Sequence, residues 1–378
     1  MNICIIGAGN IGTYLAAYIS LKEENKVWLH TSRPSAFNGT VELIEEEKNL
    51  VHNVKLHCVT SSLEEAVGNA DYVLITHPSF MVEETIESIC PYLKKGTVVG
   101  VVPGFGGKEY LIQKLLEKEC IFFGTQRVTS IIRLKEYGKS VVLKQKNPFV
   151  RIAAIPKEHT KEIAETMEKL IDIPCFALDS YLGITLSPSN PTMHPSRLYE
   201  LFKDYVPGET MYERNPYFYE EWGTEASKSL LEMDEELKAI FNSINENNDF
   251  NPLDMEKIKV RYEIETPEEL SKKINTAPGF IGIDSPMAKV EGGYIPDLSS
   301  RYFIEDLQFG LCIIKAFAEL CSVETPKVDE IIYWAQKLLK KEYVVNGRLT
   351  GKDVSELAIP QNRGIKDKRE LIKYYKNI

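Results

Sequence analysis

One histidine stands where its imidazole could transfer a proton to a small molecule. His194 lies in a segment that contains three prolines, Pro188, Pro191 and Pro195. Prolines restrict φ and disfavour helix at the residue before each ring, so we expect residues 187–201 to form a stiff connector between two domains. Small-molecule sites often lie at domain boundaries, where such a connector would hold the imidazole. The alternative is that His194 only caps a helix that begins near Ser196.

Three charged residues open an otherwise apolar helix that we expect to run from about Ser300 to Leu320. They are Arg301, Glu305 and Asp306. A guanidinium matches a substrate carboxylate, and a carboxylate can orient a catalytic imidazole. The alternative is that the acids only complement the dipole at the N-terminus of the helix, which would explain Glu305 and Asp306 but not Arg301.

The N-terminus predicts a dinucleotide site. An apolar strand, Asn2–Ile6, is followed by Gly7-Ala8-Gly9-Asn10-Ile11-Gly12 and then by an apolar helical pattern over residues 14–21. This strand, Gly-x-Gly-x-x-Gly and helix order is the dinucleotide fingerprint. Gly7 permits the tight turn, Gly9 lets the backbone approach a pyrophosphate, and Gly12 allows close packing of helix and strand. The alternative is a glycine turn in some other α/β protein.

The residues after the second strand favour a phosphorylated ribose. The strand Lys26–His30 ends in Thr31-Ser32-Arg33, where an NAD site would usually carry an acid for the ribose 2′-hydroxyl. No Asp or Glu stands there, and Arg33 with the two hydroxyls suits a 2′-phosphate. We therefore expect NADP to be the preferred cofactor, with NAD possible. The alternative is an exposed arginine in a loop.

Alternating strands and helices predict an N-terminal Rossmann domain, a doubly wound parallel sheet over residues 1–183. Further strands are expected at 55–59, 72–76, 97–102 and 120–123, with helices at 62–67 and 80–93. The loops His77-Pro78-Ser79 and Pro103–Gly107 follow two of these strands, so Pro78 and Gly104 should border the cofactor. A hairpin around Tyr137-Gly138 and a strand, helix, strand unit over 149–178 complete the domain.

The second half, residues 184–378, is expected to be an all-α domain that carries the substrate and catalytic residues. Helical stripes run over 226–242 and 326–341. An aromatic cluster over 212–222 is interpreted as core or domain-interface packing and not as a stacking platform. A loop rich in glycine and proline over 275–297 is long enough to be functional.

Composition excludes several classes of function. The net charge is −10 and no dense run of Lys or Arg occurs, so nucleic acid is not an expected partner. Seven cysteines are scattered singly, which predicts free thiols in a reducing cytoplasm and no metal site. No apolar stretch is long enough to span a bilayer, and the apolar opening runs directly into glycines, which predicts a strand and not a signal peptide.

Several motifs together resemble the octopine/nopaline (opine) dehydrogenase family over nearly the whole chain. Besides the fingerprint, they are Pro-Gly-x-Gly-Gly at 103–107, Asn-Pro-x-x-His-Pro at 190–195, Asn-Pro-x-Phe-Tyr-Glu at 215–220 and Arg-Tyr-Phe-x-Glu-Asp at 301–306. The resemblance implies a reversible reductive condensation of an amino acid with a 2-oxo acid, through an imine, with NAD(P)H. It implies that His194 is the acid/base, that Asp306 orients it, and that Arg301 binds a substrate carboxylate. Around residues 124–133 relatives often carry acidic and proline residues, whereas this sequence has Gln126 and Val128. A monomer or homodimer is expected.

Two other readings remain open. A hydroxyacid or ketopantoate-type reductase would share this architecture, but such enzymes use a lysine in the second domain and residues 187–197 contain none. A non-catalytic NAD(P)-sensing module would not need His194, Arg301 and Asp306 together.

Overall fold

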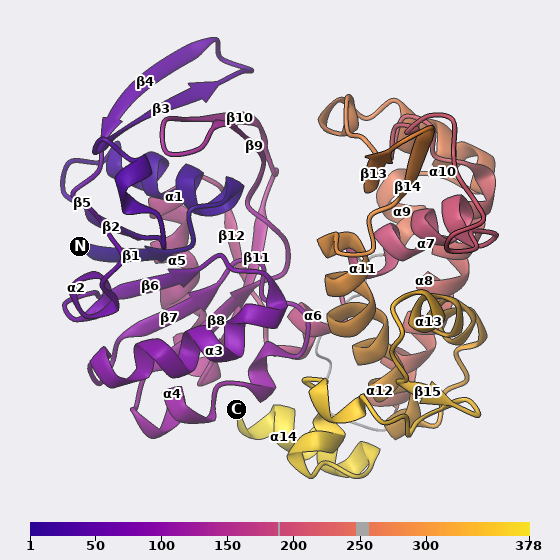
Figure 1. The fold of residues 1–378 in the computed structure, drawn as a ribbon. Helices are drawn as coiled ribbons and strands as arrows, with labels where there is room; N and C mark the ends of the chain where they lie inside the picture. The colour runs from indigo at the N-terminus through magenta and orange to yellow at the C-terminus, as the bar shows by residue number, and fades with distance from the viewer. Residues whose placement is uncertain (188–189, 247–256) are drawn as a thin grey trace. The chain divides into compact units, whose positions relative to one another are not determined.

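The protein has an α/β half followed by a largely helical half (Figure 1). The computed structural model describes residues 1–187, 190–246 and 257–378. The chain folds into two compact units, Met1–Thr185 with Asn377–Ile378, and Leu186–Lys376. The predicted fold class, a Rossmann-type sheet followed by a helical domain, is confirmed.

The large sheet of the first unit has eight strands in the order β12-β11-β8-β7-β6-β1-β2-β5. Six of them run parallel: β1 (Asn2–Ile6), β2 (Lys26–His30), β5 (Cys58–Thr60), β6 (Tyr72–Ile75), β7 (Val98–Val101) and β8 (Ile121–Thr125). The other two, β11 (Val150–Ile155) and β12 (Cys175–Ala177), are parallel to each other, but β11 is antiparallel to β8. The reversal follows because a hairpin and not a crossover helix connects β8 to β11.

Helices cover both faces of this sheet, as a doubly wound fold requires. Helices α1 (Asn10–Ser20) and α5 (Thr160–Ile171) lie against one face, and α2 (Leu63–Val67), α3 (Ser79–Ile89) and α4 (Gln113–Glu117) lie against the other (Figure 1). A short helix, α6 (Leu182–Thr185), ends the unit.

A second sheet, of which only the hairpin around Tyr137-Gly138 was predicted from the sequence, buries α1 from its other side. Its order is β4-β3-β10-β9, formed by β3 (Thr40–Glu45), β4 (Leu50–Lys55), β9 (Ser130–Glu136) and β10 (Ser140–Lys146). Residues 12–19 of α1 are all buried, in a core shared with both sheets. The expected strand at 55–59 is wrong, because Lys55 ends β4 and β5 begins only at Cys58.

The second unit is built from helices and two small hairpins. The helices are α7 (Asn190–Phe202), α8 (Thr224–Asn245), α9 (Ile258–Tyr262), α10 (Pro267–Asn275), α11 (Arg301–Asp306), α12 (Cys312–Cys321), α13 (Pro326–Leu338) and α14 (Lys368–Asn377). A π-helical turn, Leu307–Leu311, joins α11 to α12. The hairpins are β13 (Met287–Val290) with β14 (Gly293–Pro296), inside the predicted long loop, and β15 (Val344–Val345) with β16 (Arg348–Leu349).

The expected stiff connector is wrong over most of its length. Helix α7 begins at Asn190, six residues before the predicted start at Ser196, and Pro188 lies outside the described residues. Pro191 is tolerated because N–H groups in the first turn of a helix have no intrahelical partner. Pro195 lies inside the helix and removes one hydrogen bond, but residues 191–198 are all buried and their packing holds the helix together.

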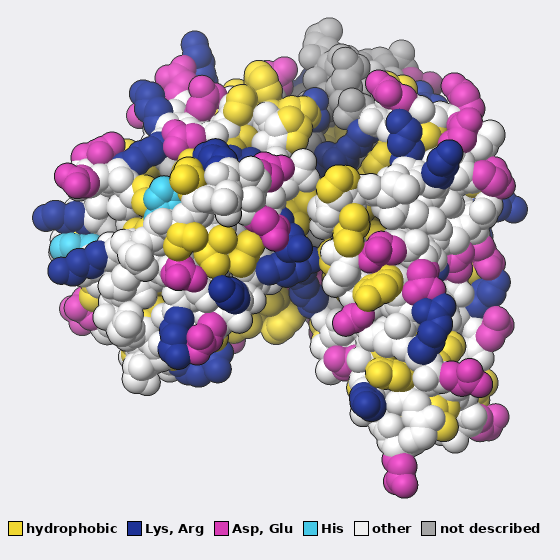
Figure 2. Space-filling view, turned by 90° about the horizontal axis from the view of Figure 1, so that it is seen from above, with side chains coloured by type: hydrophobic (Ala, Val, Ile, Leu, Met, Phe, Trp, Pro, Cys, Tyr) yellow, Lys and Arg dark blue, Asp and Glu magenta, His cyan; other side chains and the backbone are white. Residues whose placement is uncertain are grey.

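On the face drawn in Figure 2, acidic and basic side chains are interspersed over both units. Among the described residues, no helix is both long and apolar enough to cross a bilayer.

Candidate active site

The fingerprint glycines differ in what surrounds them. Gly7 has φ +100°, and a Cβ there would lie 2.8 Å from the side chains of Thr76 and His77. A Cβ on Gly12 would lie 1.7 Å from the Gly7 carbonyl oxygen. Packing therefore requires glycine at both positions. A Cβ on Gly9, at the start of α1, would meet no atom within 4 Å, so this position leaves open space beside the helix N-terminus.

That open space has the chemistry of a phosphate cradle. The first turn of α1 carries no acidic side chain, and its N–H groups point out of the helix end. The side chain of Asn10 is engaged within the protein, since its Oδ1 accepts a hydrogen bond from the Leu134 N–H of β9 at 2.8 Å, and a contact of its backbone with a cofactor stays a prediction. Ile11 is half-buried against the core. Asn10 and Ile11 thus anchor the start of α1 to the rest of the unit. The backbone around Gly9 has the space and the N–H groups to fit a pyrophosphate.

Arg33 lies on an aromatic ring that the sequence did not point to. Its guanidinium carbon is 4.0 Å from the ring centroid of Tyr137, in the turn between β9 and β10. The Tyr137 hydroxyl lies 2.8 Å from the Thr31 Oγ1, which also accepts the Arg33 N–H at 3.2 Å. Ser32 and Arg33 are exposed, whereas Thr31 is buried. The structure thus brings Thr31 and Arg33 together through Tyr137.

The hairpin that carries Tyr137 is docked onto the loop after β2. Gly138 has φ +77°, and a Cβ there would lie 2.2 Å from the Ala36 carbonyl oxygen. Only glycine allows that approach. Hence the two segments that form the Arg33 site are held at a fixed spacing, although about a hundred residues separate them in the chain.

The loops after β6 and β7 lie at the carboxyl edge of the sheet, as predicted. Pro78 immediately precedes α3, and His77 Nδ1 lies 2.8 Å from the Thr85 hydroxyl. Burial lowers the pKa of His77, which favours a neutral loop residue over a proton carrier. Gly104 is buried, its N–H donates to Thr125 O at 2.7 Å and its carbonyl accepts from the Tyr181 hydroxyl at 2.9 Å. These bonds give Gly104 a packing role, and its contact with a cofactor stays a prediction.

In the second unit, His194 and Asp306 meet in a buried pair. His194 Nδ1 lies 2.7 Å from Asp306 Oδ2, and each residue is 3% exposed. A carboxylate only accepts, so Nδ1–H is the donor. The other ring nitrogen, Nε2, lies 2.8 Å from the Tyr219 hydroxyl, which donates to it when the imidazole is neutral. Both nitrogens of the imidazole are therefore held.

Arg301 lies on the same short helix as Asp306. It is exposed, and its guanidinium carbon is 5.7 Å from the ring centroid of Tyr302. The Tyr302 ring in turn lies 4.2 Å from the imidazole of His194. Within the part of the chain that the structure describes, the Arg301 guanidinium makes no hydrogen bond or ion pair. It is thus available to a carboxylate near the histidine ring.

A close contact between α7 and the π-helical turn brings the histidine to its carboxylate. A Cβ on Gly310 would lie 2.8 Å from Pro191 Cβ and 3.1 Å from Pro191 Cα. Pro191 is one turn before His194, and Gly310 is one turn after Asp306. Single π turns inside helices are frequent at functional sites. The missing side chain at Gly310 lets the two helices approach closely enough for the 2.7 Å bond.

The first unit has an open dinucleotide cradle, and the second has a buried His-Asp pair with an exposed arginine on the same helix as the carboxylate. These features define a two-domain oxidoreductase that uses a nicotinamide dinucleotide. Residues 177–339 match the family described as NAD/NADP octopine/nopaline dehydrogenase, alpha-helical domain, and residues 3–146 match ketopantoate reductase PanE/ApbA. The latter match covers the dinucleotide-binding half only.

Whole-chain relatives carry opine dehydrogenase names. Tauropine dehydrogenase of Arabella iricolor is 31% identical, over 96% of this chain and 97% of the relative. Octopine dehydrogenase of Pecten maximus is 27% identical, over 96% of each chain. A solved octopine dehydrogenase with NADH and L-arginine superposes with a TM-score of 0.86 at 24% identity, covering 99% of this chain and 98% of that one. The chain belongs to the octopine/nopaline (opine) dehydrogenase family, NAD(P)-dependent oxidoreductases that act on CH–NH groups.

Sequence reasoning missed three residues of these sites, Tyr137, Tyr219 and Gly310. Tyr219 lies in the motif at 215–220, but its aromatic neighbours were interpreted as core packing. Phe218, Tyr219 and Trp222 all lie in the buried core of the second unit, so the packing interpretation is confirmed for these three residues. The signal that distinguishes Tyr219 is its hydroxyl, because a buried phenol needs a polar partner.

Proposed function

We propose that His194 and Asp306 carry the acid/base step of an opine dehydrogenase reaction. In that reaction an amino acid amine, a 2-oxo acid, NAD(P)H and a proton give a secondary amine, NAD(P)⁺ and water. The observation that supports the assignment is the 2.7 Å bond between His194 Nδ1 and Asp306 Oδ2 in a buried setting. An imidazole titrates near neutral pH, and a carboxylate behind it fixes its tautomer and stabilises its protonated form.

His194 would supply the proton that lets the carbonyl oxygen leave as water when the amine condenses with the oxo acid. In the reverse direction it would accept that proton. We assign the exchange to Nε2, because its bond to the neutral Tyr219 hydroxyl is weaker and more easily displaced than the charge-assisted bond between Nδ1 and Asp306. Arg301 would bind a substrate carboxylate, since an exposed guanidinium matches a carboxylate with two parallel hydrogen bonds.

The proposed dinucleotide site is supported by the space and the backbone groups around the glycine fingerprint at residues 7–12. The backbone around Gly9 and the N-terminus of α1 would hold the pyrophosphate, and the loop Thr31-Ser32-Arg33 would face the ribose. Reduced nicotinamide, when bound, supplies the hydride that reduces the imine carbon. Pro78 and Gly104 follow the neighbouring parallel strands β6 and β7 at the carboxyl edge of the sheet, so they would border this cofactor.

A preference for NADPH over NADH is supported by Arg33 on Tyr137. The ring covers one face of the guanidinium, with its carbon 4.0 Å from the ring centroid, and among the described residues no side chain or carbonyl accepts from its N–H groups, which could therefore reach a 2′-phosphate. A charge-assisted hydrogen bond contributes about 1.5–3 kcal/mol, or roughly tenfold to over a hundredfold in selectivity. Arg33→Ala should therefore lower kcat/KM with NADPH by that factor and leave kcat/KM with NADH nearly unchanged. Equal losses with both cofactors would mean that Arg33 only holds the loop.

The test of the whole proposal is a matrix of amino acids against 2-oxo acids, with NAD(P)H oxidation as the readout. We expect turnover only when both an amine and an oxo acid are present. Turnover with an oxo acid alone, unaffected by any amine, would favour a hydroxyacid or ketopantoate-type reductase instead. The molar mass of the same preparations, measured by light scattering, would decide between the monomer and the homodimer that the sequence leaves open.

A further inference from the structure

Tyr219, the second hydrogen-bond partner of the His194 imidazole, has no role in the reaction proposed above. The Tyr219 hydroxyl lies 2.8 Å from His194 Nε2, the nitrogen that must exchange a proton with the substrate. Tyr219 is 5% exposed, and the three residues form one chain of hydrogen bonds, from Asp306 through the imidazole to the phenol. A buried contact of this kind has to be built by the surrounding structure.

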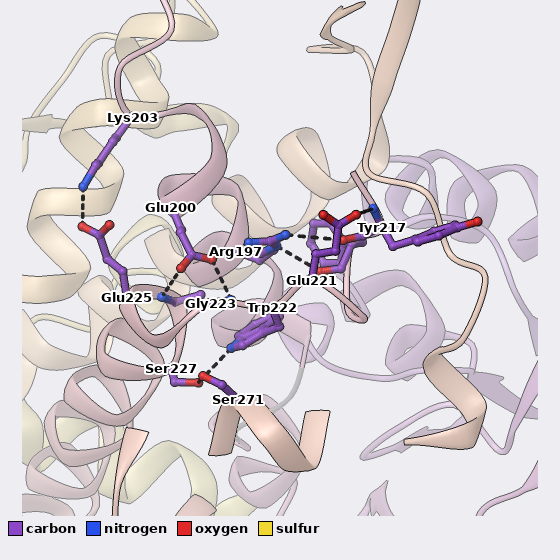
Figure 3. A network of polar contacts seen from close by, with 12 residues as sticks. Arg197, Glu200, Lys203, Tyr217, Glu221, Trp222, Gly223, Glu225, Ser227 and Ser271 are labelled. Carbon is purple, nitrogen blue, oxygen red and sulfur yellow. Dashed lines mark hydrogen bonds and ion pairs between the residues drawn. The ribbon is translucent and has the colours of Figure 1, made fainter. Parts of the chain in front are cut away.

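Helix α7 holds the segment that carries Tyr219. Arg197, one turn after His194 and 4% exposed, donates from Nε to the Phe218 carbonyl at 3.0 Å and from Nη2 to the Tyr217 carbonyl at 3.4 Å. Its guanidinium also pairs with Glu200. Figure 3 shows this network, in which Glu200 reaches on to accept the Gly223 N–H at 3.1 Å. The two residues before Tyr219 are therefore fixed to the helix that carries His194.

The predicted functional loop holds the same segment from its other side. Phe280 stacks on the Tyr219 ring with centroids 4.1 Å apart and planes 14° apart. The Phe218 N–H donates to the Ile283 carbonyl at 2.7 Å, and the Gly282 N–H donates to the Glu220 Oε1 at 2.7 Å. With both faces of the segment held, the phenol has little freedom to turn away from the imidazole.

We propose that Tyr219 is a positioning residue of the acid/base unit, which keeps the neutral imidazole in the tautomer with Nδ1–H toward Asp306 and a lone pair on Nε2. This proposal rests on the proposed role of His194. A phenol can donate to neutral Nε2 and, after its O–H turns, accept from Nε2–H, so it can partner the imidazole in either protonation state and gives Nε2 up to the substrate for the proton transfer itself. Burial raises the pKa of Tyr219 well above its usual value, which keeps the phenol neutral throughout.

The test combines spectroscopy and kinetics on Tyr219→Phe, which removes the hydroxyl and keeps the ring on Phe280. In ¹⁵N-histidine-labelled protein in mildly alkaline buffer, the His194 signals of the wild type should show a protonated Nδ1 and a hydrogen-bonded, unprotonated Nε2. His194→Gln identifies those signals among the six histidines. In Tyr219→Phe the Nε2 signal should shift, and kcat should fall about three- to tenfold, the loss expected for one neutral hydrogen bond, while KM for both substrates stays within about twofold.

The matched control is Tyr212→Phe. Its hydroxyl donates to the Leu201 carbonyl at 3.2 Å, so the variant loses one hydrogen bond in the same aromatic region without touching the imidazole. The control should leave both the His194 signals and kcat unchanged. Wild-type protein with Nε2 protonated in place of Nδ1 would overturn the proposal even if Tyr219→Phe did not fold. Unchanged His194 signals in folded Tyr219→Phe would also overturn it, and since the spectrum needs no turnover, this outcome is separate from a failure of the proposed function.

Discussion

Gly310→Ala tests whether the close approach of two helices creates the His194–Asp306 bond. The new Cβ would start 2.8 Å from Pro191 Cβ and 3.1 Å from Pro191 Cα, whereas carbon atoms prefer separations of about 3.5–4.0 Å. The two helices must therefore move apart, because both of these atoms belong to a rigid proline. Overpacking of this kind costs about 1–3 kcal/mol of stability. The movement also lengthens the 2.7 Å bond, which joins residues one turn away on each helix.

We expect Gly310→Ala to lose about tenfold to a hundredfold in kcat, because a misplacement of about 1 Å at a catalytic group can cost a factor near 10². The assay is steady-state turnover with amine, oxo acid and cofactor, together with thermal unfolding. The control is Gln308→Ala in the same π-helical turn, whose side chain donates a long hydrogen bond to the Glu356 carbonyl at 3.4 Å and which should stay within about twofold of wild type. Wild-type kcat in Gly310→Ala would refute the reasoning, since the bond would then not depend on the spacing of the helices.

Three further predictions concern catalysis, the cofactor and stability. His194→Ala should reduce kcat by about 10²–10⁴ and leave the Kd of the cofactor unchanged; full activity would return His194 to a packing role. Gly9→Ala should fold normally, since its Cβ meets no protein atom within 4 Å, yet weaken NADH and NADPH equally in a fluorescence titration, unlike the selective loss in Arg33→Ala. Asp234 accepts the Ile258 N–H, and burial raises its pKa from 3.8 to about 6. The native state thus binds this proton more tightly than the unfolded state, so stability falls as the pH rises through about 4 to 6. Asp234→Asn should be more stable than wild type at about pH 8, on the order of 2–3 kcal/mol, with the difference gone below about pH 4 in urea unfolding curves.

Local patterns predicted the parts of the fold that local chemistry determines. The fingerprint at 7–12 is confirmed as a tight turn between β1 and α1, because Gly7 and Gly12 are required by contacts within a few residues of the turn and with one adjacent strand. The helices α8 and α13 follow stripes of apolar residues that the sequence displays directly. The His194–Asp306 contact spans 112 residues, and it was expected from the resemblance of two motifs and not from spacing.

Contacts between residues far apart in the sequence determine the features that local patterns did not predict. Strand β3 pairs with β10 of a hairpin about a hundred residues away, and β4, which pairs with β3, is mostly exposed, so no apolar pattern indicated it. Helix α7 forms in spite of Pro195 because its residues are buried among other helices. The importance of Gly310 depends on Pro191, which lies 119 residues earlier in the printed sequence, and no local pattern reports such a contact.

In the proposed reaction, hydride reaches the carbon of an imine formed between an amine and an oxo acid. The most direct measurement is the product of one turnover with cofactor deuterated at the transferring position of the nicotinamide, an amino acid and a 2-oxo acid, analysed by mass spectrometry. The account predicts a secondary amine with one deuterium on the former carbonyl carbon. A deuterated 2-hydroxy acid, with the amino acid recovered unchanged, would contradict it.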